Sequence, residues 1–127
     1  IRSMTFFEVL MWVESFPYYY DVGEGLLPDT WATPMEFLYA DMYGKNRDCE
    51  DFSIFLSFIA KYYFGYEASI VAINTDGVAW GHMVSRIDGV LIEPQTGTPY
   101  NMGYYDYILK EYTIEDALHI AEFGVLR

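Results

Sequence analysis

The chain has 127 residues, of which 53% are hydrophobic and 20% aromatic, so it is long and apolar enough to bury one core and unlike a disordered segment. Nineteen acidic against seven basic residues give a net charge of −12. This charge repels phosphate backbones and argues against a nucleic-acid partner; it either keeps the protein in solution or favours a cationic partner or a divalent metal.

Targeting and redox signals are sparse. One cysteine cannot form an internal disulfide, and no apolar run is long enough to span a bilayer. No signal peptide is recognisable, which favours a cytoplasmic location. We expect a single domain over residues 1–127; because the chain starts at Ile1 rather than Met, a truncated N-terminus is compatible with it. The sequence indicates no oligomeric state.

The first predicted element is a short helix. Residues 4–15 are apolar on all sides, which is typical of a buried helix, and Pro17 ends the pattern. Residues 16–32 then form an aromatic loop that contains glycine and proline. Because this loop is longer than most connections, we expect it to pack near a site.

A second helix is predicted from its start signal. Thr33 can cap, Pro34 suits the first helical position, and Glu36 can reach back to complete a capping box. We expect this helix to run to Tyr43 and to be closed by Gly44.

The principal helix is predicted from Asp48 to Gly65. The Asp48 carboxylate can cap the first turn, and Gly65 is a typical C-terminal stop. Steps of three and four residues predict one buried stripe, formed by Cys49, Phe52, Leu56, Ile59 and Tyr63.

From residue 68 the pattern changes to that of strands. Asp76-Gly77 and Asp88-Gly89 are both two-residue hairpin signals. They predict a three-stranded antiparallel meander with strands at 68–75, 78–87 and 90–94.

The C-terminal part is less regular. Residues 95–103 are predicted to be a loop, and 106–112 stay unassigned. Thr113 caps a last helix that ends at Gly124. His119 on this helix is interpreted as structural. Helices first and a sheet afterwards indicate an α+β domain.

Cys49 is the first candidate for chemistry. A helix N-terminus stabilises the reactive thiolate, and Cys49 follows directly after the expected cap. The neighbouring carboxylates of Asp48, Glu50 and Asp51 raise the thiol pKa, so a nearby imidazolium is needed to offset them. The competing interpretation is a small buried hydrophobic residue.

The second hairpin brings His82 and Glu93 together. If Asp88-Gly89 is a two-residue turn, Val84 faces Glu93, and His82 is the diagonal neighbour of Glu93 on the same face. A carboxylate there can hold one imidazole nitrogen and leave the other for the thiol. An ordinary cross-strand pair is the alternative.

A metal site of the Cys/His kind is not indicated, because one cysteine and two scattered histidines offer no ligand spacing. Asp48, Glu50 and Asp51 place three carboxylates on one turn, which suits a hard cation such as calcium. Helix capping explains the same three residues.

The motifs Arg47-Asp48-Cys49-Glu50-Asp51-Phe52-Ser53, Gly81-His82 and Ile92-Glu93-Pro94-Gln95-Thr96-Gly97 resemble the transglutaminase-like cysteine-protease superfamily. The upstream run Trp31-Ala32-Thr33-Pro34-Met35-Glu36-Phe37 is similar to the segment that precedes the cysteine in its bacterial transglutaminase-like cysteine proteinase branch. The similarity covers about residues 31–97. Departures are Glu93, where the family usually has aspartate, and His82-Met83-Val84 in place of His-Ala-Trp.

The resemblance implies a papain-like core, with N-terminal helices packed on a small antiparallel sheet. It implies that Cys49 is the nucleophile, His82 the base and acid, and Glu93 the residue that orients the imidazole. It also implies a calcium site at Asp48, Glu50 and Asp51, although no cofactor is required. Trp31 is a candidate to line the substrate site.

The expected function is hydrolysis of a peptide or protein substrate at an amide bond through a thioester. Two alternatives use the same residues: acyl transfer to an amine, and a catalytically silent domain that binds a protein. Glu93 in place of aspartate favours the silent domain, whereas an intact Cys49 and His82 favour the enzyme.

Overall fold

The computed structural model describes residues 3–18, 31–43, 47–75 and 81–124. Within them the chain is a mixed α+β structure with a five-stranded antiparallel sheet in the order β4-β3-β2-β1-β5. The helices are α1 (Phe6–Glu14), α2 (Pro34–Leu38), α3 (Ala40–Tyr43), α4 (Cys49–Phe64) and α5 (Ile114–Phe123). The strands are β1 (Ala68–Asn74), β2 (Gly81–Ile87), β3 (Val90–Glu93), β4 (Thr98–Pro99) and β5 (Tyr107–Thr113).

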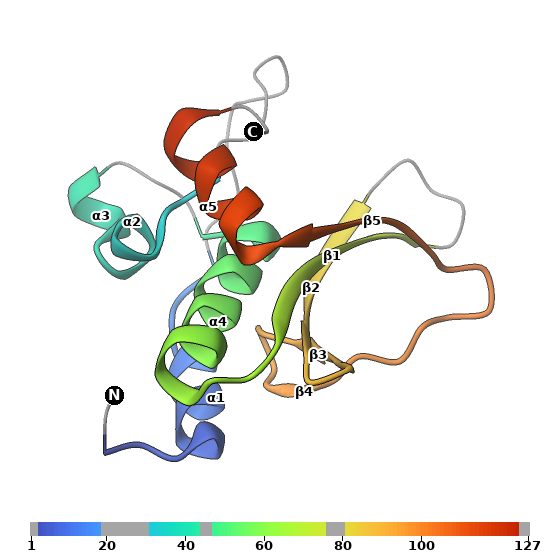
Figure 1. Ribbon diagram of the computed structural model, residues 1–127, viewed down its shortest axis with the longest axis horizontal. Coiled ribbons are helices and arrows are strands. Elements are labelled where there is room, and N and C mark those ends of the chain that lie inside the picture. Colours follow the sequence, from blue (N-terminus) through green and yellow to red (C-terminus); the bar gives the residue numbers. More distant parts are fainter. Residues whose placement is uncertain (1–2, 19–30, 44–46, 76–80, 125–127) are drawn as a thin grey trace.

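Helix α4 is the centre of the molecule. It packs on β1 and β2 with one side and on α1 and α2 with the other, while α5 lies beside it (Figure 1). The main core therefore forms around α4, where aromatic rings stack closely; Phe37 and Phe55 have ring centroids 4.4 Å apart. A second core on α4 joins Ile54 to Ile70 and Ile114.

The N-terminal helix is confirmed as α1, but it is not buried on all sides, because only Val9 and Val13 are buried and Phe7 is 69% exposed. The predicted second helix is interrupted. Instead of one helix to Tyr43, the chain forms α2 and α3, and Tyr39 between them has non-helical angles of φ −116° and ψ 43°. The Arg47 guanidinium explains the break, because its Nε donates to the Phe37 carbonyl at 2.7 Å and its Nη2 to the Leu38 carbonyl at 3.2 Å. Arg47 thus satisfies the two carbonyls that would otherwise accept backbone N–H groups from a continuing helix. Gly44, the predicted stop, lies outside the described residues.

The predicted bounds of α4 are confirmed. Gly65 adopts the left-handed conformation with φ 71°, and its N–H donates back to the last turn. The predicted stripe is wrong at Tyr63, whose side chain is 48% exposed. The buried face instead widens toward the N-terminal end, where charged residues are buried as well.

The three-stranded meander is also confirmed. Asp88 and Gly89 have φ values of 47° and 83°, as a two-residue hairpin of this kind requires, and Ile87 pairs with Val90. The first predicted hairpin turn, at Asp76-Gly77, lies outside the described residues.

Two strands were not predicted. β4 interrupts the segment 95–103, and β5 occupies the unassigned segment 106–112, where it pairs with β1 through contacts such as Ser69 with Thr113. Nearly every residue of β5 is exposed, so its sequence lacks the alternation that marks a half-buried strand.

The last helix is confirmed as α5, capped by Thr113 and stopped by Gly124. The His119 ring lies against Phe123, with ring centroids 4.7 Å apart, on the exposed end of this helix. Among the described residues, no helix is both long and apolar enough to cross a membrane.

Candidate active site

Cys49 is the first residue of α4 and lies at an open edge of β2. Ile87 and Val90 form the pair next to the turn, so the N–H of Ile87 points toward β3. N–H groups alternate along a strand, and those of Ser85 and Met83 therefore point the same way. Because β3 ends at Glu93, the N–H of Met83 lies beyond the last described pair, and it faces the Cys49 sulfur, where it lowers the thiol pKa. The helix start is thereby joined to the sheet through the thiol.

His82 and Glu93 meet as the hairpin register predicts. The Nε2 atom of His82 lies 2.7 Å from Oε1 of Glu93, and both side chains are largely buried. The ring of Tyr100 packs against the imidazole, with ring centroids 5.7 Å apart. Because Nε2 is engaged by the carboxylate, Nδ1 is the ring atom available to a thiol.

Cys49 and His82 line one cavity of about 190 Å³. Strand alternation places His82 on the same face as Val84, away from α4, so the two reactive side chains approach this cavity from different sides of β2. Within the described residues no hydrogen bond joins them; the thiol donates to Oε2 of Glu50 at 3.4 Å. The cavity is lined by Trp31, Cys49, Glu50, Ala72, Gly81, His82 and Met83.

Trp31 lies in the wall of this cavity. Its ring packs edge-on against Tyr112 of β5, with centroids 5.2 Å apart. The next residue, Ala32, donates its N–H to Oδ1 of Asp51 at 2.7 Å. A carboxylate of α4 therefore fixes the segment that carries Trp31.

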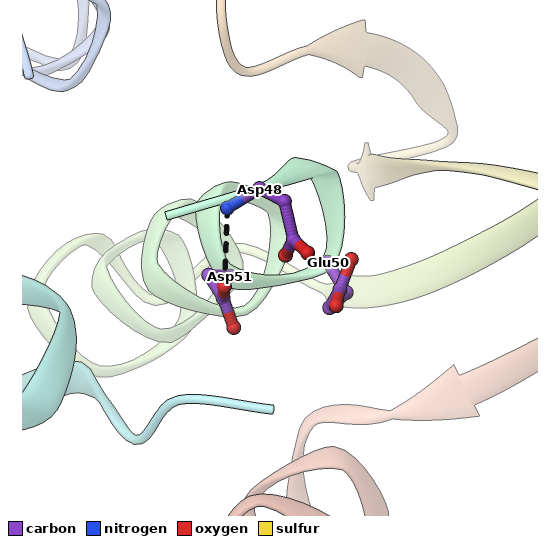
Figure 2. A group of neighbouring side chains, drawn as sticks. All are labelled: Asp48, Glu50 and Asp51. Atoms are coloured by element: carbon purple, nitrogen blue, oxygen red, sulfur yellow. Dashed lines mark hydrogen bonds between the residues drawn. The ribbon is translucent and has the colours of Figure 1, made fainter. Parts of the chain in front are cut away.

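The three predicted carboxylates gather at the N-terminal end of α4 (Figure 2). Their exposed fractions are 7% for Asp48, 3% for Glu50 and 1% for Asp51. One oxygen of each residue lies within 4.8 Å of the others, which is close enough to share a cation. Asp51 also accepts the Asp48 N–H at 3.1 Å, as a capping residue does.

Burial and negative charge raise the pKa values of two groups at this end of α4, Cys49 and Asp51. Burial raises the pKa of the Cys49 thiol, and the charges of Glu50 and Asp48 raise it further, while the Met83 N–H opposes the shift. Burial likewise raises the pKa of Asp51 to about 7, and the Glu50 charge adds to this against hydrogen bonds from Asp48 and Ala32. Glu50 and Asp48 therefore act on the thiol pKa in the expected direction.

Two structural contributions were not predicted from the sequence. Arg47 is buried between the rings of Phe16 and Phe37, with its guanidinium carbon 4.9 and 5.3 Å from their centroids, and connects α2 to the start of α4. Ser53 and Ser57 are buried one turn apart on α4: the Ser53 carbonyl accepts from Ser85 of β2, and the Ser57 hydroxyl contacts Ser85 and the Ser69 carbonyl of β1. Two serines at positions i and i+4 of an otherwise apolar helix were the available signal.

A larger cavity, of about 600 Å³, lies at the opposite end of α4. Four of its charged side chains form ion pairs: Lys61 pairs with Glu115, and Arg86 with Glu111 at 2.9 Å. Among the described residues that line it there is no cysteine or histidine, so the thiol and the imidazole are found only around the smaller cavity of the two.

No protein-family model, curated protein or solved structure matches this chain. What the site does is therefore inferred from its own residues.

Proposed function

We propose that this protein is a cysteine-dependent hydrolase of peptide or amide bonds, with Cys49 as nucleophile, His82 as base and acid, and Glu93 as the residue that orients the imidazole. The observation that carries the proposal is that Cys49 and His82 line one cavity while Glu93 holds the far nitrogen of the imidazole. A helix-start cysteine beside a histidine and a carboxylate on neighbouring strands supports a papain-like arrangement.

The raised pKa of Cys49 decides how the reaction begins. The resting thiol is neutral, so His82 accepts its proton at Nδ1 as the sulfur attacks the substrate carbonyl. Glu93 keeps the proton of the other nitrogen on its own side and stabilises the imidazolium that forms. A preformed thiolate is not required.

The remaining steps use the same three groups. The tetrahedral intermediate collapses when His82 returns the proton to the leaving amine, which gives a thioester on Cys49. His82 then takes a proton from water, the hydroxide attacks the thioester, and the acid product leaves as the thiol is protonated again. The backbone N–H of Cys49 donates to no acceptor among the described residues and is a candidate donor to the oxyanion.

A change of side-chain conformation has to precede this reaction. The thiol donates to Glu50 in the structure, so the sulfur has to turn from Glu50 toward His82 before the proton can move. Loose geometry of this kind is common in sites without substrate.

The carboxylate cluster is proposed as the place where a cation acts on this site. Asp48, Glu50 and Asp51 have the oxygen ligands that calcium prefers, and one oxygen of each lies within 4.8 Å of the others. A divalent cation there lowers the thiol pKa, because it cancels the charge that raises it.

A silent domain that binds a protein through its cleft is the second candidate. The contact between Cys49 and Glu50, and the missing one between Cys49 and His82, favour it. The two candidates differ in one measurable property, which is the dependence of thiol chemistry on His82.

The test combines hydrolysis of a mixed peptide library with iodoacetamide labelling of Cys49. Cys49→Ala is expected to abolish hydrolysis and to keep the fold, whereas His82→Ala lowers the rate by about 10²- to 10⁴-fold. Glu93→Gln is expected to reduce it less, because an amide still positions the ring. His119→Ala is the matched control, since that ring lies on α5 against Phe123. Full turnover in Cys49→Ala would eliminate the enzyme and leave the binding module.

A further inference from the structure

We infer that Ser85 is a positioning residue of this site: its hydroxyl sets the register of α4 on β2 and thereby the placement of Cys49 relative to His82. The inference rests on the proposed function for its consequence in catalysis. Its evidence is a ladder of buried hydroxyl groups between helix and sheet. Ser53, Ser57 and Ser85 are each 0% exposed.

The ladder connects the reactive helix start to the strand of the base. The Ser53 hydroxyl donates to the Cys49 carbonyl at 2.8 Å, and the Ser85 hydroxyl donates to the Ser53 carbonyl at 3.0 Å. The Ser57 hydroxyl lies 2.9 Å from that of Ser85 and 3.2 Å from the Ser69 carbonyl. Every step involves a main-chain carbonyl or another buried hydroxyl, so each polar group has a partner.

Ser85 can affect the site because of its position on β2. It is two residues from Met83, whose N–H meets the Cys49 sulfur, and three from His82. A shift of α4 along the strand therefore changes the approach of the thiol to both groups.

Hydrogen bonds restrict such a shift where apolar contacts do not. Apolar contacts are non-directional, whereas a buried hydroxyl that loses its partner keeps its full desolvation penalty. A satisfied polar network in a core selects one arrangement among similar ones. The bonds of Ser85 select the position of α4 on β2 in which the start of the helix lies at the open edge of the strand.

The experiment compares Cys49 alkylation by iodoacetamide at pH 7 in four proteins: the native chain, Ser85→Ala, His82→Ala and the double variant. Ser85→Ala is expected to slow alkylation by about tenfold in the native background, because the thiol is displaced from its base. In the His82→Ala background it should change nothing further, since the base is already absent. Equal slowing in both backgrounds would overturn the positioning role.

Controls separate register from stability. Ile59→Val removes one methylene from the same buried helix without touching the ladder, and it is expected to leave the alkylation rate unchanged. Ser85→Thr retains the hydroxyl and should restore most of the rate. If Ser85→Ala does not fold, Ser57→Ala removes the helix hydroxyl that contacts Ser85 and the Ser69 carbonyl, and it gives the same comparison.

A second readout does not depend on catalysis. Amide exchange at Met83 reports the contact between β2 and the Cys49 sulfur, and Ser85→Ala should accelerate it by about tenfold more than Ile59→Val does. If His82→Ala leaves alkylation unchanged, the proposed function fails, but faster Met83 exchange still supports the register. Unchanged exchange in Ser85→Ala overturns the inference whatever the activity.

Discussion

The two ends of helix α4 differ in how far their charged side chains are exposed to solvent. At the C-terminal end Lys61 pairs with Glu115, and their side chains are 36% and 39% exposed. At the N-terminal end Glu50 and Asp51 are 3% and 1% exposed and lie beside a half-buried thiol. Both ends suit the helix dipole, but only the N-terminal end has the desolvation cost of burying like charges together. Perturbed groups that gather at a cavity are typical of functional sites, and here they coincide with the cysteine.

The largest effect is expected when one carboxylate is removed from each end of α4 and Cys49 alkylation is measured. Glu50→Gln is expected to raise the alkylation rate of Cys49 by about tenfold or more, because the Glu50 charge and its hydrogen bond both raise the thiol pKa. Glu115→Gln is the matched control and should change nothing. A rate in Glu50→Gln equal to that of the native chain would show that burial alone keeps the thiol protonated.

The pH dependence of stability tests the buried end directly. The pKa of Asp51 is raised from 3.8 to about 7, so the folded state binds more protons than the unfolded state between these values. The stabilisation is fully present below about pH 4 and is lost as pH rises through about 7. Urea unfolding of the native chain should show this loss.

Asp51→Asn is the comparison for this measurement. It removes the proton and one acceptor, so the variant should be less stable at pH 5 and should lack the Asp51 component of the slope. Parallel profiles of the two proteins between pH 4 and pH 7 would contradict a raised Asp51 pKa.

A smaller effect is expected from calcium. Cation and proton compete for the same carboxylates, so calcium should raise the melting temperature and the alkylation rate at pH 8 and lose both effects at pH 5. Glu50→Gln should weaken the response. No heat of binding in calorimetry and an unchanged rate would mean that the three acids act as helix caps.

The smallest effect is expected at the exposed end. Lys61→Gln breaks the pair with Glu115, but solvent screens that interaction, and the urea midpoint should shift less than in Asp51→Asn. A larger shift for Lys61→Gln would remove the contrast between the two ends of α4.

The helix ends and the hairpin could be predicted from the sequence because they depend on local interactions. Thr33 with Glu36, Thr113 and Gly65 set helix ends through bonds within a few residues. Asp88-Gly89 fixes the hairpin and through it the contact between His82 and Glu93, because a two-residue turn leaves one register for the strands. These features depend on neighbours in the chain, so the sequence pattern contains them.

Only the tertiary structure decided the rest, because it depends on groups distant in sequence. β5 is a strand through its pairing with β1, and α2 ends where Arg47 takes its carbonyls. The depth of burial that raises the pKa of Asp51, and the choice of Glu50 over His82 as partner of the thiol, arise where α4, β2 and the segment before α2 converge. Desolvation is a property of that assembled environment, and residue type and spacing do not specify it.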